Sequence, residues 1–471
     1  MKFINRIKEL SFIDKEFAAK QSSFIVVYGK RRVGKTELIK ESGKNKKLLY
    51  FLGRQVNNKD NLEQISQICS VFFKEPILVG QPFLNWDQFF SYLASHLKKN
   101  TQIVFDEYPY FVTAQPGLST IFQKWWDETL KKIPYCKLII CGSSFGMMIE
   151  ETLSEKAPLY GRRTGQIHVK PFSFYDSWKF FPKLSFSQFL EFYSVTGGNP
   201  EYLNRFSSYK TISEAIKQEV FSTHSPLYEE IDFLLKEELR EPKNYYSILK
   251  SLALKRNKIN DLIEQTGIEK SSLHTYLYYL ENLGLIEKEV SITESHPEKS
   301  RKGIYRIKDQ FVNFWFQFVL PYRREIEIGE IDFLMKKTKN QMPKIIQENY
   351  QRIAPEIITK YSNISRIEQI GRYWNNENEI DNVGINEATK EIFFIESKWS
   401  DRLIGGNILD ELISKAKIVD WNNISRKEKF ILLSKSGFTQ ELISKSKNNN
   451  VFLIFKDDLI TQQKINYLKQ K

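Results

Sequence analysis

The chain has 471 residues, of which 41% are hydrophobic and 14% aromatic, so it can form about two to four domains with real cores and is not broadly disordered. Its net charge of +13 favours a polyanionic partner, nucleic acid first, although excess lysine can also serve solubility alone. Three cysteines at no metal-binding spacing argue against a disulfide framework or a zinc site. With neither a signal-peptide core nor an apolar run long enough to span a bilayer, the sequence predicts a cytoplasmic protein without membrane contact.

A phosphate-binding pattern stands between the first predicted strand, 24–28, and a predicted helix that starts near residue 37. It matches G-x-x-x-x-G-K-[ST] at every constrained position and consists of Gly29, Lys30, Arg31, Arg32, Val33, Gly34, Lys35 and Thr36. The glycines let backbone N–H groups point at phosphate oxygens, and the helix presents its positive N-terminus to the same anion. Lys35 is predicted to reach the β- and γ-phosphates and Thr36 to ligate Mg²⁺. The alternative is a glycine turn before an ordinary helix.

Two acidic residues at the end of a later strand supply the other half of such a site. The apolar run 102–105 ends in Asp106 and Glu107. Asp106 is predicted to hold Mg²⁺, directly or through water, and Glu107 to polarise the water that attacks the γ-phosphate. An apolar run followed by two acids is a weak signal alone, but it becomes a strong one after a phosphate-binding loop.

Two more candidates follow along the chain. The strand predicted over 137–144 ends in hydroxyls, and Ser143 is expected either to sense the γ-phosphate or hold the attacking water, or instead to cap the next helix. Arg162 and Arg163 are candidates to stabilise charge on the transferred phosphoryl group, with a solvated basic loop as the alternative. Because strands alternate with helices throughout this region, the sequence predicts an α/β fold with a parallel sheet covered on both faces and nucleotide at its C-terminal edge.

These motifs together closely resemble the archaeal-type AAA+ ATPases, relatives of the STAND NTPases; the matching segments are 29–36, 104–107, 160–163 and 196–200. The resemblance implies a AAA+ P-loop core over 1–172 and a small helical lid over 173–235. It also implies that the nucleotide is ATP and that Arg6 lies near the adenine side of the pocket. From the residues alone, the segment 197–200, Gly-Gly-Asn-Pro, indicates only a turn between two helical segments.

The middle of the chain, 236–325, has the pattern of a winged helix-turn-helix. Helices are predicted over 244–254, 257–267 and 271–283, followed by short strands at 285–290 and 303–307. In such modules the third helix enters the major groove and the wing touches the DNA backbone. The residues predicted to face DNA are Lys270, Ser272, His274 and Tyr278 on the helix and Lys299, Arg301 and Lys302 on the wing. Since this face is not strongly basic, docking on a protein partner or a second copy of the chain is the alternative. The archaeal-type family carries a winged helix in this place.

The last part of the chain, 326–471, contains a second constellation of charged residues. Glu396 and Lys398 are two apart on a predicted strand, so their side chains share a face, and a hairpin can bring Asp381 beside them. Such a set suits a Mg²⁺-dependent phosphodiester hydrolase in which Asp381 and Glu396 ligate the metal and Lys398 orients the attacking water. Glu348, in a predicted helix, is the candidate that completes the metal ligands. The alternative is a solvent-facing hairpin with an ion pair.

This set looks like the signature of the PD-(D/E)XK nuclease superfamily, with Ile380 in place of the proline of that name. In the archaeal-type family a C-terminal domain with this pattern is common, although a nuclease fold can also bind nucleic acid without cutting it. We therefore expect the ATP state to control a half of the chain that binds DNA, rather than RNA, and that in the stronger form of the hypothesis cleaves it. The alternatives are a nucleotide-operated signalling or docking switch, and a defence nuclease released by a trigger.

Overall fold

The computed structural model describes residues 3–460, except 240, 301, 362–363, 365, 376–377 and 447–449. The chain forms two compact units. The first comprises Met1–Phe172, Asn199–Glu201 and Asp232–Pro242, and the second comprises the remaining segments. Arg301, which is predicted on the wing, lies outside the described residues.

The first unit is built on a five-stranded parallel sheet with the order β2-β3-β4-β1-β5. Its strands are β1 (Ser23–Tyr28), β2 (Lys47–Leu52), β3 (Thr101–Asp106), β4 (Cys136–Gly142) and β5 (Gly165–His168). Every residue of β3 and β4 is buried, as expected for central strands of a parallel sheet that is covered on both faces. The sheet confirms the predicted α/β fold.

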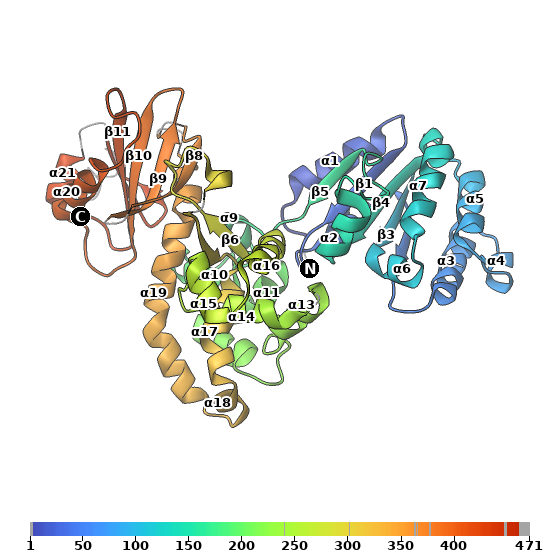
Figure 1. Ribbon diagram of the computed structural model, residues 1–471, viewed down its shortest axis with the longest axis horizontal. Coiled ribbons are helices and arrows are strands. Elements are labelled where there is room, and N and C mark those ends of the chain that lie inside the picture. Colours follow the sequence, from blue (N-terminus) through green and yellow to red (C-terminus); the bar gives the residue numbers. More distant parts are fainter. Residues whose placement is uncertain are drawn as a thin grey trace. The chain divides into compact units, whose positions relative to one another are not determined.

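Helices cover both faces of this sheet (Figure 1). One face carries α1 (Ile7–Ala18) and α2 (Lys35–Ser42). The other carries α3 (Asn58–Phe73), α4 (Ile77–Gly80), α5 (Trp86–His96), α6 (Tyr108–Ala114), α7 (Leu118–Glu128) and α8 (Phe145–Met148). Helices α3 and α5 begin where the side chains of Asn57 and Asn85 accept hydrogen bonds from the first-turn N–H groups of Asp60 and Gln88.

A run of short helices follows over the segment predicted as a lid. These are α9 (Phe174–Trp178), α10 (Phe186–Thr196), α11 (Pro200–Phe206), α12 (Ile212–Ala215) and α13 (Glu230–Glu238). A capping box between Ser185 and Gln188 starts α10. Gly197, with a φ of +57°, lies between α10 and α11 and confirms the predicted turn.

Three helices and a two-stranded antiparallel hairpin come next, in the predicted order. They are α14 (Pro242–Ala253), α15 (Ile259–Thr266), α16 (Lys270–Asn282), β6 (Ile286–Glu289) and β7 (Ile304–Ile307), followed by α17 (Gln310–Phe318) and α18 (Arg323–Glu327). The leucines at 273, 277 and 280 recur at helical spacing, so they lie on one face of α16. This face is buried.

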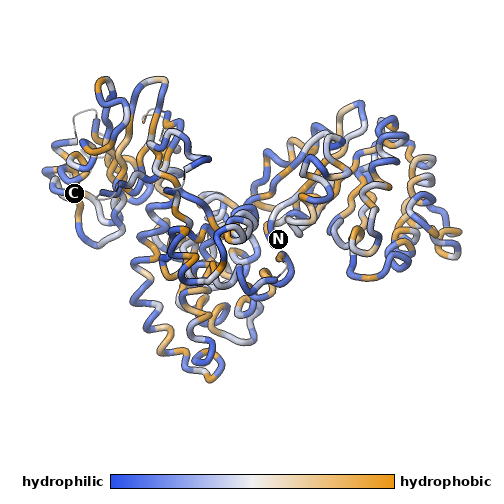
Figure 2. Tube along the Cα trace, viewed as in Figure 1, coloured by the Kyte–Doolittle hydropathy of each residue, from blue (hydrophilic) through white to orange (hydrophobic). Residues whose placement is uncertain are grey.

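The C-terminal part of the second unit is a mixed sheet of six strands in the order β13-β12-β11-β10-β9-β8. Its elements are α19 (Ile331–Ile358), β8 (Gln369–Trp374), β9 (Glu379–Asn386), β10 (Glu391–Lys398), α20 (Gly406–Ala416), β11 (Lys427–Ser434), α21 (Gln440–Lys445), β12 (Val451–Phe455) and β13 (Asp458–Leu459). Strands β10, β11 and β12 run parallel, and α20 and α21 share a hydrophobic core with the sheet. Figure 2 shows hydrophobic residues gathered along the strands of both sheets.

In the part of the chain that the structure describes, none of the helices combines the length and the apolar character needed to cross a bilayer.

Candidate functional site

The loop between β1 and α2 folds as a backbone cradle. Gly29 has a φ of +152°, and a Cβ atom added there would lie 2.3 Å from the carbonyl oxygen of Val169, so only glycine fits. Gly34, with a φ of +90°, caps the N-terminus of α2. Arg32 also adopts a left-handed backbone, with a φ of +65°. The loop therefore turns tightly enough to aim N–H groups and a helix N-terminus at one anion.

The Lys35 ammonium lies inside this cradle. Its Nζ donates to the carbonyl oxygens of Gly29 at 2.9 Å and Lys30 at 3.0 Å, and the residue is only 5% exposed. Arg6 supports the loop from outside, because its guanidinium donates to the carbonyl oxygen of Val33 at 3.1 Å. The loop thus holds a pre-positioned cation on backbone carbonyl oxygens, as a phosphate site requires.

The other basic side chains of the loop differ from Lys35 in their contacts and in their burial. Arg31 forms an ion pair with Glu237, and both side chains are partly exposed. Lys30 is buried, whereas Arg32 is partly buried. Arg6 also donates to the carbonyl oxygen of Lys170 at 2.6 Å.

Asp106 and Glu107 lie at the end of β3, beside the loop. Oδ2 of Asp106 accepts hydrogen bonds from the hydroxyls of Thr36, at 2.8 Å, and Tyr50. Glu107, with a φ of +51°, starts α6, and its carboxylate accepts from the Ser143 hydroxyl at 2.9 Å and the Ser143 N–H at 3.3 Å. The structure therefore brings Lys35, Thr36, Asp106, Glu107 and Ser143 into one site.

Tyr50 is a member of this site that sequence reasoning missed. Tyr50 lies in the apolar run that forms β2, and this pattern predicts that it belongs to a strand but does not predict a role in the site. Burial raises the pKa of the Tyr50 phenol well above its usual range, and the hydrogen bond to Asp106 raises it further. The phenol consequently stays a proton donor to the carboxylate at any physiological pH.

Arg162 and Arg163 are held by the segment that carries them and by α7. Arg162 pairs with Asp127 at 3.0 Å and donates to the carbonyl oxygen of Tyr160. Arg163 donates to the carbonyl oxygen of Thr152 at 3.1 Å. In the described structure these contacts stabilise the loop, and none of these hydrogen bonds reaches Lys35, Asp106 or Glu107.

The second constellation lies at one end of the β9–β10 hairpin. Ile395 and Asn382 are the last paired residues of these antiparallel strands, and Glu396 and Asp381 follow one position beyond. The Lys398 ammonium lies 2.6 Å from a Glu396 carboxylate oxygen. The structure therefore brings all three predicted residues together.

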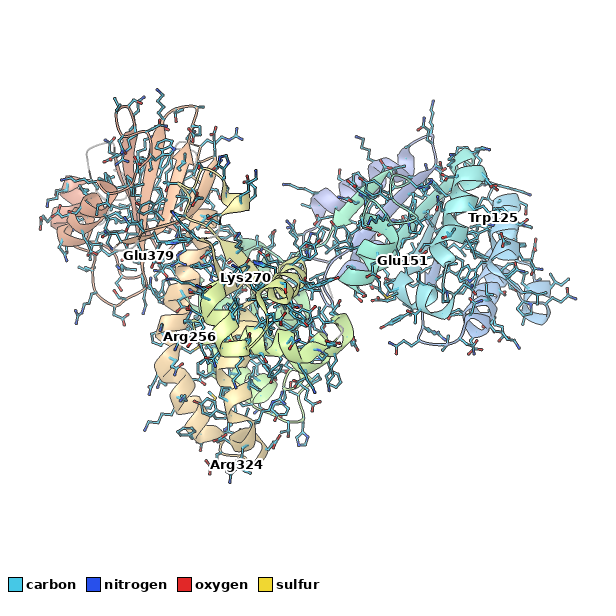
Figure 3. All side chains as sticks on the ribbon, viewed as in Figure 1. Trp125, Glu151, Arg256, Lys270, Arg324 and Glu379 are labelled. Carbon is cyan, nitrogen blue, oxygen red and sulfur yellow. The ribbon has the colours of Figure 1, made fainter. Side chains whose placement is uncertain are left out.

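Electrostatics mark Asp381 as the perturbed member of this set. Burial raises the pKa of Asp381 from 3.8 to about 6, and the nearby charges of Glu396 and Glu379 add to the rise. Glu379, labelled in Figure 3, opens β9. Lys398 and Arg372 oppose the shift. A carboxylate whose ionisation is disfavoured by a second carboxylate in a partly buried site is typical of a place where a cation binds.

Helix α19 contributes glutamines rather than the predicted glutamate. Gln351 donates to the Asp381 carboxylate, whereas Glu348 pairs with Lys255 at 2.8 Å. One turn earlier, Gln347 donates to the carbonyl oxygen of Ser397 at 2.7 Å and accepts from the N–H of Trp399, so it holds the backbone on both sides of Lys398. Over the described residues, no three carboxylate, histidine or cysteine side chains converge as a ready metal cage. Residues four apart lie on the same face of a helix, so the spacing of Gln347 and Gln351 could have predicted that both contact the same neighbouring segment.

A polar cavity of about 590 Å³ adjoins Asp381 and is bounded by the β6–β7 hairpin, α19 and strands β8 and β9. Oppositely charged side chains pair across it. Arg306 lies 2.7 Å from Glu287, and Arg372 lies 2.8 Å from Glu289. The Arg306–Glu287 pair joins the two strands of the hairpin, whereas the Arg372–Glu289 pair and the hydrogen bond from the Ile292 N–H to the Arg372 carbonyl oxygen, at 2.9 Å, bind the hairpin to the edge of the C-terminal sheet.

Comparison with known proteins agrees with this geometry. Residues 3–206 match a family described as an ATPase domain predominantly from Archaea, and residues 315–413 match a family of archaeal and bacterial proteins of unknown function. The uncharacterized protein MJECL04 of Methanocaldococcus jannaschii is 32% identical over 403 residues, which span 85% of this chain and 88% of that protein. The chain belongs to the archaeal-type ATPase family. Its first unit is therefore a nucleotide-binding P-loop ATPase domain.

Two further likenesses concern parts of this archaeal-type ATPase. The uncharacterized ATP-binding protein MJ0423 of the same organism is 46% identical over 46 residues, or 10% of this chain and 78% of that protein. Among solved structures, the Walker-type ATPase PABY2304 of Pyrococcus abyssi superposes with a TM-score of 0.52 at 19% identity, covering 67% of this chain and 96% of that one. This second likeness supports the fold alone.

The raised pKa of Asp381 predicts an unusual pH dependence of stability for the metal-free protein. Because the folded-state pKa of about 6 lies above the ordinary 3.8, the free energy of unfolding falls as the pH rises from about 4 to about 6. Asp381→Asn removes this penalty, so the variant should be more stable than the wild type by about 3 kcal/mol at pH 8, and equal to it near pH 3.5. Chemical denaturation of both proteins in EDTA at the two pH values measures the difference. A variant destabilised at pH 8 would contradict the electrostatic account.

Proposed function

We propose that the first unit hydrolyses ATP with Mg²⁺ held at Thr36 and Asp106. The observation that carries this proposal is the 2.8 Å contact between the Thr36 hydroxyl and the Asp106 carboxylate, directly beside Lys35 and Glu107. Bound there, Mg²⁺ neutralises charge on the β- and γ-phosphates. Lys35 exchanges the carbonyl oxygens of the loop for phosphate oxygens, and Glu107, held by Ser143, orients the attacking water.

For the C-terminal sheet we propose a Mg²⁺-dependent phosphodiester hydrolase site. Asp381 and Glu396 would hold the metal, while Lys398 orients the attacking water and stabilises developing charge. The proximity of the two carboxylates, expressed in the raised pKa of Asp381, supports this assignment. The paired glutamines of α19 support it too, because they hold Asp381 and the backbone around Lys398 in place.

This proposal predicts Mg²⁺-dependent cleavage of DNA or RNA that is lost in Asp381→Ala and Lys398→Ala. Cleavage should fall by at least about 10²-fold, since each change removes a group that acts on the metal or on the water. A gel assay with single- and double-stranded substrates, with and without ATP, measures it. Asp410→Ala, which changes an exposed carboxylate on α20, is the matched control and should cleave normally. Cleavage that survives in Asp381→Ala would refute the site.

We further propose that nucleic acid contacts the three-helix and hairpin module, read as a winged helix, and that the nucleotide state controls this contact. The four residues predicted on the third helix are exposed, among them Lys270 at the start of α16 (Figure 3). A nucleic acid is the favoured ligand because the chain carries a net charge of +13. DNA is favoured over RNA because the third helix of such modules enters the major groove.

DNA is accordingly expected to raise the ATPase rate at low salt and to lose this effect as the salt concentration increases, because phosphate contacts release counterions. ATPase rates with and without DNA or RNA, at about 50 and 200 mM salt, test the expectation. Lys270→Glu should abolish the stimulation, whereas Lys250→Glu, an exposed lysine on α14, should retain it. Equal rates under all conditions would remove nucleic acid as the effector.

One observation favours a second candidate function, a nucleotide-operated docking switch whose last domain does not cut. Charged residues of the hairpin are already paired, since Glu289 contacts Arg306 of the hairpin itself and Arg372 of the C-terminal sheet. A hairpin held in this way has fewer cations to offer to a DNA backbone. Absence of cleavage across all substrates in the assay above, with Mg²⁺ supplied, would favour this switch. A third form of the hypothesis is a defence nuclease that a trigger releases. Such a protein would show no cleavage until the trigger is supplied.

A further inference from the structure

Two hydroxyl groups meet on one oxygen of the Asp106 carboxylate. The first, from Thr36, belongs to the phosphate-binding motif. The second, from Tyr50, belongs to no motif and comes from β2, where Tyr50 pairs in register with Val104 of β3. Two separate elements, α2 and β2, thus converge on the same oxygen atom.

The other carboxylate oxygen is also engaged. Oδ1 of Asp106 accepts a hydrogen bond from the N–H of Glu107 at 3.0 Å. Asp106 is fully buried, so its orientation depends on these protein donors rather than on solvent. A carboxylate has about four acceptor positions. The hydroxyls of Thr36 and Tyr50 and the Glu107 N–H engage three of them, and the buried Cys141 thiol also hydrogen-bonds this carboxylate. Without the phenol, Oδ2 would keep only one of its two hydroxyl donors, that of Thr36, which is itself a proposed metal ligand.

We propose that Tyr50 is a positioning residue of the ATPase site, which fixes the rotation of the Asp106 carboxylate and so holds its Oδ2 atom beside the Thr36 hydroxyl, where the metal is proposed to bind. The inference rests on the Mg²⁺ site proposed above. Outer partners of metal-binding groups typically change metal affinity or activity by about 10- to 100-fold when they are removed. Tyr50 acts through Asp106 and does not touch the nucleotide.

The test is Tyr50→Phe, which keeps the ring that packs against the α1–α2 core and removes only the hydroxyl. The Mg²⁺ concentration at half-maximal ATPase rate should rise by about 10- to 100-fold. In a second readout, the gain in affinity that Mg²⁺ confers on a fluorescent ADP analogue should shrink, while the affinity measured in EDTA stays within about 2-fold of the wild type. Tyr92→Phe is the matched control, because its hydroxyl also donates to a carboxylate, that of Glu75, at 2.9 Å.

A double variant separates positioning from general structural support. If Tyr50 acts through Asp106, Tyr50→Phe should have no further effect on Mg²⁺ dependence in an Asp106→Asn background. A wild-type Mg²⁺ midpoint in Tyr50→Phe, or an equal loss in the Asp106→Asn background, overturns the proposal. If the wild type itself shows no Mg²⁺ dependence in either readout, the metal site fails and the role of Tyr50 fails with it, which differs from a Tyr50 failure at an intact metal site.

Discussion

Replacing Lys35 with alanine is expected to abolish ATP turnover, with a loss of roughly 10²- to 10³-fold or more. The ammonium is the cation held inside the loop, 2.9 Å from the Gly29 carbonyl oxygen, so its removal leaves the γ-phosphate without this charge partner in the transition state. A steady-state phosphate-release assay at saturating ATP measures the effect. Turnover that is unchanged would refute the assignment of the loop.

The Lys35 experiment needs proof that the variant is folded. Loss of the ammonium removes a donor from two buried carbonyl oxygens and costs about 1–3 kcal/mol of stability, which a folded domain can tolerate. Circular dichroism and a thermal melt should therefore show a folded protein. Lys40→Ala is the matched control: Lys40 lies on the same helix, is exposed and pairs only loosely with Glu37, at 3.7 Å. It should hydrolyse ATP at the wild-type rate.

Glu107→Gln is expected to slow hydrolysis by about 10²- to 10⁴-fold while ATP binding is retained. The amide oxygen can still accept the hydrogen bond from Ser143, so the side chain keeps its place but loses the charge that polarises water. Single-turnover hydrolysis, compared with the affinity for a fluorescent ATP analogue, separates the two effects. A parallel loss of binding and hydrolysis would assign Glu107 to nucleotide binding instead.

Two further variants calibrate the Glu107 result. Ser143→Ala leaves the carboxylate charged but removes its 2.9 Å partner, so a smaller loss of rate is expected. Glu128→Gln changes an exposed carboxylate at the end of α7 and should leave the rate unchanged. A loss in Ser143→Ala as large as that in Glu107→Gln would mean that the hydroxyl itself contacts the γ-phosphate or the water, the sensing role considered for Ser143.

Local sequence was sufficient for the features that short segments encode. The spacing of Gly29, Gly34 and Lys35 specifies a tight anion-binding turn, because each position has a backbone or side-chain requirement that neighbours in the chain supply. Apolar runs that end in polar residues located the strand that presents Asp106. Strand periodicity put Glu396 and Lys398 on one face, and their proximity in the structure agrees with this.

The contacts that complete each site depend on which distant segments become neighbours. Tyr50 reaches Asp106 only because β2 pairs with β3, and Ser143 reaches Glu107 only because β4 lies on the other side of β3. Likewise, Gln351 rather than Glu348 meets Asp381 because of the rotation of α19 about its axis. Strand order and helix rotation are set by the packing of the whole core, to which many side chains contribute small energies. A short sequence pattern therefore does not predict them.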